Sequence, residues 1–241
     1  MKIYAATQKG VQKVQNEDRV VLNQNILSMG IHECEYAEGF VAVADGVGGN
    51  NAGAVASQFV AEELGKCDHT IENLTEINRK LIERSRTDEA LAGMATTLAL
   101  MDFTVDSAKI TYVGNTRVYA VVNGKYQKQL TRDDTTLEYL LVTGQLDAST
   151  AEYFNRKNEI TACFGAGNPA LLKLKQIDVS VQDILIITSD GIHDYVSLDE
   201  MEDIYCAADD TDDKMVFCKK LIEQAVENGS MDDASVMVMN K

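Results

Sequence analysis

Two apolar stretches of this sequence end in the same dipeptide, Asp-Gly. Residues 40–46 read Phe-Val-Ala-Val-Ala-Asp-Gly, and residues 184–191 read Ile-Leu-Ile-Ile-Thr-Ser-Asp-Gly. Short apolar runs closed by a glycine turn are typical of buried strands. A third apolar run, residues 234–239, comes directly after Asp232 and Asp233. The pattern therefore predicts carboxylates at the ends of three buried strands.

Asp45, Asp190 and Asp232 could converge on one face of the fold. A cluster of carboxylates is unfavourable unless cations neutralise it, because like charges repel and burial removes their hydration. Ligands that are all oxygen atoms favour magnesium or manganese over zinc. We therefore predict a two-metal hydrolytic site. Any one of these aspartates alone could equally be a turn former or a helix cap.

Composition excludes several classes of protein. The 241 residues contain 22 Lys and Arg against 38 Asp and Glu, a formal charge of -16. A chain this acidic repels phosphate backbones, so nucleic acid is not an expected partner. The five cysteines show no Cys-x-x-Cys spacing, which indicates reduced thiols in a cytoplasmic protein. No signal peptide and no apolar run of membrane-spanning length is recognised.

The remaining pattern indicates a mixed fold in one domain, residues 1–241. We predict strands over residues 2–7, 19–23, 40–44, 95–103, 108–113, 117–122, 125–131, 171–177, 184–188 and 234–239. We predict helices from residue 52 onward and over residues 71–86, 133–141, 149–154 and 211–228. Residues 25–39, which include His32, are predicted to form a solvated surface connection. Strands in two groups with helices between them define an α+β fold.

Seven short motifs, in order along nearly the whole chain, resemble those of the PP2C (PPM) family of metal-dependent protein phosphatases in its compact bacterial form. Each motif alone is weak, but the complete series in the family's order is specific. They are Asn16-Glu-Asp18, Val43-Ala-Asp-Gly-Val-Gly-Gly49, Gly93-Met-Ala-Thr-Thr-Leu98, Val113-Gly-Asn-Thr-Arg-Val-Tyr119, Gln129-Leu-Thr-Arg-Asp-Asp134, Thr188-Ser-Asp-Gly-Ile-His-Asp194 and Asp232-Asp-Ala-Ser235.

The resemblance implies a four-layer αββα sandwich, with two antiparallel sheets face to face and helices outside. It implies hydrolysis of phosphoserine and phosphothreonine in proteins by a metal-activated water, with two Mn²⁺ or Mg²⁺ ions. In this reading Asp45 bridges the ions, the carbonyl of Gly46 binds one, and Asp190 and Asp232 complete the ligands of the second ion. Glu17 also serves in catalysis, and Asp18 supports the metal-bound waters from behind.

Two positions depart from the family's pattern. Lys13 stands where the family usually has an arginine that binds the substrate phosphate, and lysine offers a point charge instead of two parallel hydrogen bonds. Asn115 stands where the family has an aspartate that, with the residue matching Asp194, holds a third ion. We therefore expect the third ion to bind weakly or not at all.

The expected partner is a phosphorylated protein in a bacterial-type signalling pathway, where the chain would act as a monomer and oppose a serine/threonine kinase. The alternative is a pseudo-phosphatase that recognises a phosphorylated partner with little or no turnover. Lys13 and Asn115 favour this alternative, whereas the three aspartates Asp45, Asp190 and Asp232 favour the enzyme.

Overall fold

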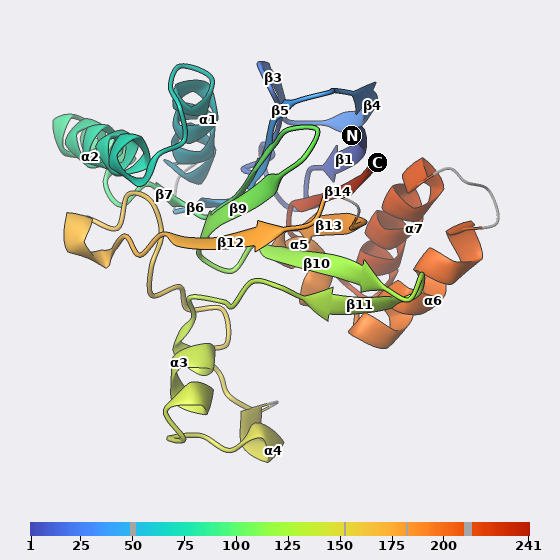
Figure 1. The fold of residues 1–241 in the computed structure, drawn as a ribbon. Helices are drawn as coiled ribbons and strands as arrows, with labels where there is room; N and C mark the ends of the chain where they lie inside the picture. The colour runs from blue at the N-terminus through green and yellow to red at the C-terminus, as the bar shows by residue number, and fades with distance from the viewer. Residues whose placement is uncertain (49–51, 152, 182, 210–213) are drawn as a thin grey trace.

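Two six-stranded antiparallel sheets form the centre of the computed structural model (Figure 1). The structure describes residues 1–48, 52–151, 153–181, 183–209 and 214–241. The first sheet has the order β11 (Tyr126–Gln129), β10 (Arg117–Val122), β13 (Leu185–Thr188), β14 (Ala234–Asn240), β1 (Lys2–Gln8) and β4 (Gly30–Glu35). The second has the order β12 (Lys175–Val179), β9 (Ala108–Val113), β8 (Leu98–Phe103), β5 (Gly39–Ala44), β2 (Arg19–Leu22) and β3 (Asn25–Leu27).

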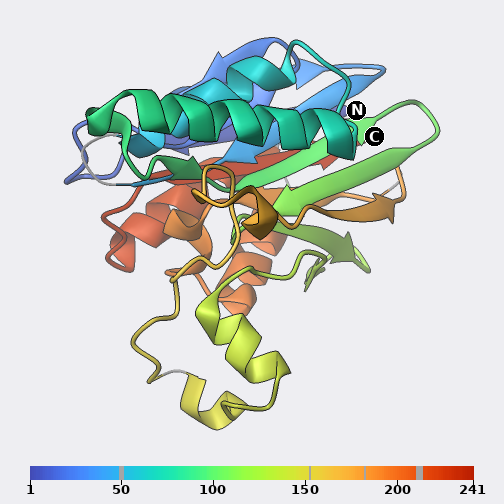
Figure 2. The same ribbon diagram turned by 90° about the vertical axis from the view of Figure 1, so that its left-hand side faces the viewer.

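Helices cover the outer faces of the two sheets (Figures 1 and 2). The second sheet is covered by α1 (Ala52–Leu64) and α2 (Ile71–Thr87). The first is covered by α5 (Asp190–His193), α6 (Leu198–Asp209) and α7 (Lys214–Glu227). The predicted four-layer sandwich is confirmed, because each sheet packs one face on the other sheet and one face on helices.

The core lies in three layers, since both faces of each sheet are covered. Ile3, Val43 and Met237 are fully buried between the sheets. Tyr4 and its neighbours face α6 and α7, while Val21 and its neighbours face α1 and α2. Side chains therefore alternate between two buried faces, and β1 is buried along five successive residues. Each fully buried large apolar side chain contributes about 1.5–3 kcal/mol to folding.

α2 shows how local sequence sets an element. Thr70 caps the helix by accepting a hydrogen bond from the backbone N–H of Asn73. Leu74, Ile77 and Leu81 then recur at helical spacing and are buried against the second sheet. The predicted helix over residues 71–86 is confirmed.

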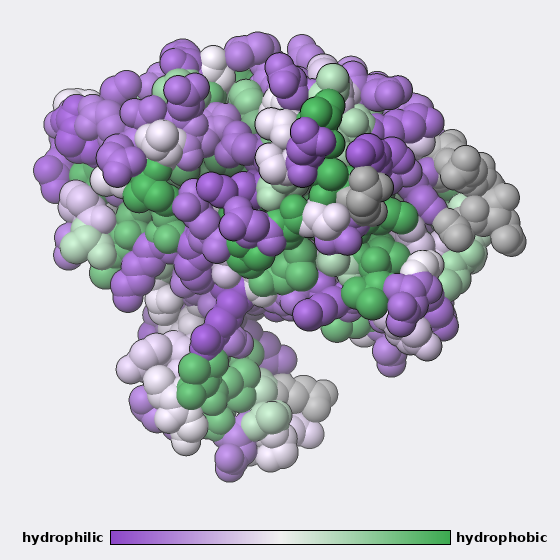
Figure 3. Space-filling model, viewed as in Figure 1, coloured by the Kyte–Doolittle hydropathy of each residue, from purple (hydrophilic) through white to green (hydrophobic). Residues whose placement is uncertain are grey.

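Residues 136–151 project from the sandwich as a separate lobe (Figures 1 and 2). It carries the short helices α3 (Thr136–Val142) and α4 (Ala148–Ala151). Figure 3 shows apolar side chains gathered on this lobe, and Tyr139 and Val142 are more than half exposed there. Short helices joined by a turn bury too little apolar surface to pack closely, so these side chains remain in contact with solvent.

The prediction of a surface connection over residues 25–39 is wrong. This segment contains β3 and β4, which pair with β2 and β1, and His32 lies opposite Ala5 in the ladder instead of in a loop. Only His32 and Cys34 of β4 are half-buried, and the other side chains are exposed. An edge strand of this kind is held by backbone hydrogen bonds from its neighbour, which leave no hydrophobic signal in the sequence.

Four other features differ from the prediction. The predicted strand over residues 95–103 is divided into β7 (Ala95–Thr96), which pairs with β6 (Gly46–Val47), and β8. Pro169–Leu171 forms a 3-10 turn, so β12 begins only at Lys175. A second such turn, Glu89–Leu91, follows α2, and α6 occupies residues for which no helix is predicted.

The predicted helix over residues 211–228 corresponds to α7, and its expected first turn lies outside the described residues. Within the described residues, no helix combines the length and the apolar character needed to cross a membrane.

Candidate metal centre and active site

Strand pairing brings the predicted carboxylates together. β13 and β14 are antiparallel, with Thr188 opposite Val236, so the end of β13 lies beside the start of β14. This places Asp190 next to the loop that holds Asp232. In the second sheet Arg19 lies opposite Ala44, so residues 16–18 lie beside the end of β5 and Asp45. The cluster thus forms at the ends of internal strands, at one end of the two-sheet sandwich.

Asp45 and Asp190 form the half-buried centre of the cluster. Each carboxyl group lies close enough to the other to affect its pKa. Burial, followed by repulsion from Asp190, Asp18 and Asp232, raises the pKa of Asp45 well above its usual value. Burial and the charges of Asp194 and Asp232 raise the pKa of Asp190 to about 6. The two groups therefore hold negative charge at a cost that a bound cation would lower.

Asn115 is buried and directed at this pair. It precedes β10, whose first residue, Arg117, lies opposite Thr188 of β13. Its Nδ2 donates a hydrogen bond to Oδ2 of Asp190 at 3.2 Å. Its Oδ1 is buried and finds no partner among the described residues, so it is an available oxygen at the centre of the cluster.

Asp232 lies at the more open side of the cluster and is bound by Lys13. The ammonium group of Lys13 is 2.9 Å from Oδ1 of Asp232 and 2.9 Å from Oε2 of Glu17. Partial burial opposes it, but hydrogen bonds with Glu17 and Asp232 raise the pKa of Lys13 above its usual value. Lys13 is therefore a cation held between two of the predicted acidic site residues.

Asp18 lies behind the cluster. Its Oδ2 accepts hydrogen bonds from the hydroxyls of Ser189 at 2.7 Å and Ser235 at 2.6 Å. Burial raises the pKa of Asp18 to about 7, although the two serine hydrogen bonds act in the opposite direction. Asp18 thus contacts the two segments that carry Asp190 and Asp232, in keeping with the supporting position predicted for it.

Asp233, which adjoins Asp232, holds the loop before β2 in place. Its carboxylate accepts hydrogen bonds from the backbone N–H of Gly10 at 2.8 Å and of Glu17 at 2.7 Å. Because its oxygens are used in this way, the carboxylate ties the segment that carries Lys13 to the segment that carries Asp232.

Two glycines permit the close packing of this site. A Cβ atom at Gly46 would lie 2.3 Å from the carbonyl oxygen of Gly53 in α1. A Cβ atom at Gly191 would lie 1.9 Å from the carbonyl oxygen of Asp233. Any side chain would separate these segments, so glycine after each strand-end aspartate is a packing requirement.

Asp194 and Asn115, the pair predicted for a third ion, have different partners. Oδ2 of Asp194 accepts a hydrogen bond from the amide of Asn158, which follows the projecting lobe. No hydrogen bond joins Asn115 to Asp194 within the described ranges. Asn115 thus contacts Asp190 at the start of α5, and Asp194 lies at the other end of this helix.

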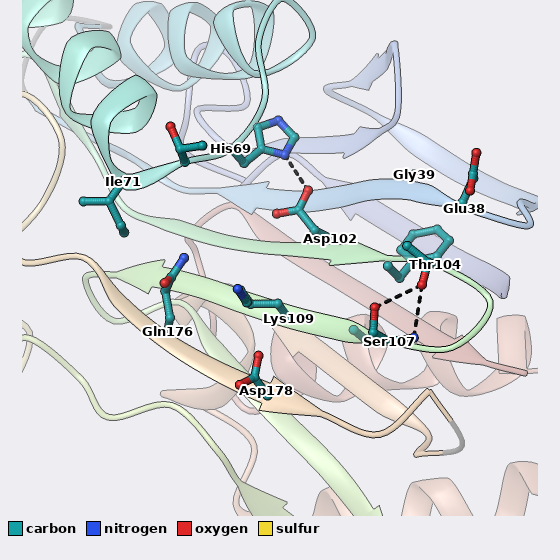
Figure 4. A pocket seen from close by; sticks show the side chains of 13 residues that line it. Glu38, Gly39, His69, Ile71, Asp102, Thr104, Ser107, Lys109, Gln176 and Asp178 are labelled. Atoms are coloured by element: carbon teal, nitrogen blue, oxygen red, sulfur yellow. Dashed lines mark hydrogen bonds and ion pairs between the residues drawn. The ribbon is translucent and has the colours of Figure 1, made fainter.

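Two hollows open beside the cluster. One, of about 340 Å³, is lined by Lys13, Asp232 and Tyr195, and the other, of about 400 Å³, by Asp194, Asn158 and Tyr195. Tyr195 is thus common to both. A larger hollow of about 860 Å³ lies elsewhere, over the outer face of β8, β9 and β12 beside His69 and Asp102 (Figure 4). None of the predicted site residues lines it.

The residues of the cluster fit divalent cations in their chemistry. All the donors are oxygens, Asn115 Oδ1 lacks a partner, and Lys13 already lies among the carboxylates as a positive charge. Within the part of the chain described, no group of three His, Cys, Asp or Glu side chains is arranged as a complete ligand set. The predicted site does not require one, because it combines few carboxylates with a backbone carbonyl and water.

Sequence analysis missed two kinds of residue. Ser189 and Ser235 lie inside the quoted motifs, so their neighbours signalled them, although their bonds to Asp18 depend on pairing of β13 and β14. Asn158 and Tyr195 carry no such signal, because only the position of the projecting lobe brings Asn158 to Asp194.

Comparisons with known proteins agree with this site and fold. Protein phosphatase PhpP of Streptococcus pneumoniae strain D39 is 27% identical over 253 residues, covering 100% of this chain and 97% of that protein. A putative protein phosphatase 2C-type of Streptococcus pyogenes is 26% identical over the same shares of the two chains. No family model matches the chain.

Solved structures give the same fold. The serine/threonine phosphatase of S. agalactiae has a TM-score of 0.81 at 24% identity, covering 99% of this chain and 98% of that one. The catalytic domain of the phosphatase PstP, in complex with two manganese ions, has a TM-score of 0.75 at 23% identity, with coverage of 99% and 98%.

The fold is that of the PP2C-type protein phosphatases. The carboxylates that follow its strands lie together at one end of the sandwich. Along its whole given sequence the chain is similar to bacterial protein phosphatases, one of which is named as a putative 2C-type enzyme.

Proposed function

We propose that this protein is a metal-dependent phosphatase that hydrolyses phosphoserine and phosphothreonine in proteins. The observation that carries the proposal is the cluster of strand-end carboxylates, in which Asp45 and Asp190 lie close enough to affect each other's pKa. Buried acidic groups with strongly raised pKa values are frequent at functional sites, and here they lie in the fold of a phosphatase family.

Two Mn²⁺ or Mg²⁺ ions would lower the pKa of water toward neutrality and offset negative charge on the phosphoryl oxygens. Asp45 and the carbonyl of Gly46 would hold the ions from the second sheet, and Asp190 and Asp232 from the first. Glu17 and Asp18 would orient the water molecules around them. Asn115 would keep Oδ2 of Asp190 in a fixed direction through its amide hydrogen bond.

Lys13 would bind the substrate phosphate. Its ammonium group lines the hollow beside Asp232, where an incoming phosphoryl group could replace its contact with that carboxylate. A lysine interacts with phosphate as a point charge, so it attracts the group without fixing its orientation. Tyr195 lines the same hollow and would contact the residues around the phosphorylated side chain.

We further propose that the protein opposes a serine/threonine kinase and acts as a cytoplasmic monomer. Cys34, Cys67, Cys163 and Cys206 are free thiols, which suits a reducing compartment. The pseudo-phosphatase alternative has less support, because Asp45, Asp190 and Asp232 are all present and the homologues are named as phosphatases.

The test is hydrolysis of a phosphothreonine peptide in the presence of Mn²⁺. We expect a chelator to abolish turnover and Asp45→Asn to lower kcat by at least about 10³-fold, as losses of transition-state charge stabilisation do. Asp183→Asn is the matched control, since Asp183 lies at the opposite end of β13, where its backbone N–H bonds to Ser180. Turnover that survives chelation would contradict the proposal.

A further inference from the structure

Another hollow lies beside α1, on the outer face of the second sheet, and basic side chains line it. It has a volume of about 260 Å³ and is lined by two arginines, Arg19 of β2 and Arg84 of α2. A single phosphate with a few water molecules fits this volume. None of the carboxylates of the candidate metal centre lines it.

Arg19 is buried, with 8% of its surface exposed, and its protein partners are all neutral. Nη1 donates to the carbonyl oxygens of Asn16 and Asp18, each at 2.7 Å, and Nε donates to Oε1 of Gln58 at 2.6 Å. Nη2 has no partner among the described residues. The carboxylates of Asp18, Asp233 and Glu17 act on the charge of Arg19 without forming an ion pair with it, and Nη2 remains a free donor.

Arg84 also lacks an acidic partner in the described part of the chain. Its guanidinium lies 5.6 Å from the centre of the Phe59 ring, which holds it over the hollow's edge. The contrast with other arginines is clear, since four of the seven form ion pairs with carboxylates: Arg79, Arg117, Arg132 and Arg156. Arg19 and Arg84 form no ion pair in the described part of the chain, and both line this hollow.

One carboxylate lines the hollow, that of Glu62, and it accepts a hydrogen bond from Nε2 of Gln58 at 2.8 Å. Gln58 thus connects Glu62 to Arg19 through its two amide atoms. Glu62 is exposed and one turn of α1 further from Arg19 than Gln58, so it reduces the positive charge of the hollow without occupying it.

We propose that this hollow binds a phosphate-sized oxyanion between Arg19 and Arg84. Guanidinium groups bind phosphate oxygens through paired hydrogen bonds, and two of them from different elements can hold a tetrahedral anion from two sides. The anion is either inorganic phosphate or a second phosphoryl group on a protein substrate. The anion would contact Arg19, whose Nη1 also donates hydrogen bonds to the backbone of residues 16–18.

Binding of inorganic phosphate to the chelator-treated full-length protein tests the site apart from the metal centre. We expect titration calorimetry to show saturable binding that Arg84→Ala weakens at least about ten-fold, as loss of a charge-assisted pair does. Glu62→Gln should tighten it, because a like charge is removed. Arg86→Ala is the matched control, since Arg86 lies on the same helix, is exposed and does not line the hollow.

A crystal soaked in tungstate should place the heavy anion between Arg19 and Arg84. Absence of binding, or equal effects of Arg84→Ala and Arg86→Ala, would overturn the proposal. Its two sources are separated with Mn²⁺-loaded protein and peptides bearing one or two phosphoserines. If Arg84→Ala lowers kcat/KM for the doubly phosphorylated peptide relative to the single one, the anion is a substrate group. If the ratio stays constant while phosphate binding is lost, the anion is free phosphate.

Discussion

Asn115 donates a hydrogen bond from its amide to Asp190, and no hydrogen bond joins it to Asp194 in the described part of the chain. The amide brings a donor to a carboxylate that burial would otherwise keep protonated, and this hydrogen bond opposes the rise in the pKa of Asp190. An aspartate at this position could not donate in its ionised form. The substitution therefore exchanges a negative charge for a fixed contact inside the two-ion centre.

The first prediction concerns Asn115→Asp. We expect the variant to show one additional Mn²⁺ binding event in a calorimetric titration and higher turnover at limiting metal, because charge count largely determines affinity for a hard cation. Asn115→Ala, which removes the hydrogen bond without adding charge, should show no additional event. Tight binding of three ions by the wild type, or no change in Asn115→Asp, would make the departure from the family pattern incidental.

The second prediction concerns Lys13. Lys13→Ala should raise KM for a phosphothreonine peptide by roughly 10–100-fold, the effect of losing one hydrogen bond to a charged group. Lys13→Arg should keep or lower KM, because the guanidinium can bind phosphate with two parallel bonds. Lys66→Ala, at an exposed lysine on the far side of α1, serves as the control. An unchanged KM in Lys13→Ala would show that Lys13 does not bind the substrate and only forms ion pairs with Glu17 and Asp232.

The third prediction concerns Asn158, which joins the projecting lobe to Asp194. Asn158→Ala should release the lobe, and limited proteolysis should cleave residues 143–168 several-fold faster, because a local opening then costs less free energy. Asn155→Ala is the matched control, since Asn155 lines the same hollow. Equal cleavage rates in the two variants would show that the hydrogen bond does not hold the lobe.

The fourth prediction concerns pH and the His69–Asp102 pair (Figure 4). Both ring nitrogens of His69 face acceptors, with Nδ1 at 2.5 Å from Asp102 and Nε2 at 3.0 Å from the carbonyl oxygen of Leu64. Both can be satisfied only when the ring is protonated. Burial opposes this, but the hydrogen bond and charge of Asp102, the Leu64 carbonyl and Asp68 raise the pKa of His69 above its usual value.

Because the folded-state pKa of His69 is raised, its stabilisation is complete below the unfolded pKa and is lost as pH rises through the folded one. We expect Tm to fall between pH 6 and pH 9 by about 2–4 °C, the shift that 1 kcal/mol causes in a domain of this size. This component should vanish in His69→Gln and in Asp102→Asn. His32→Gln is the control, and a wild-type profile unchanged in His69→Gln would refute the assignment.

Much of this molecule could be predicted from local pattern. Apolar runs closed by Asp-Gly identified β5 and β13 and placed Asp45 and Asp190 at their ends, because hydrophobic periodicity reports burial and glycine reports a sharp turn. The apolar residues at helical spacing in α2 likewise predicted which face of this helix is buried. These features depend on residues that are close in sequence, so they can be recognised without the fold.

The series of motifs indicated the family, and the family implied the four-layer sandwich. This was possible because the order of the motifs reflects the order of the strands. The sequence pattern did not predict β4 or α6. β4 is an edge strand that depends on β1 for its hydrogen bonds, and α6 shows its apolar face only against α7 and β11. Neither element has a strong local signature of its own.

Only the tertiary structure decided which polar groups meet. The pairing of β13 with β14 brings Asp190 to the Asp232 loop, and the position of β10 directs Asn115 at Asp190. The same packing sets Lys13 between Glu17 and Asp232 and brings Arg19 and Arg84 to one hollow. The sequence by itself determined the kinds of residue and their places on strands and helices. Their contacts depend on register and packing between segments distant in the chain, which local periodicity does not encode.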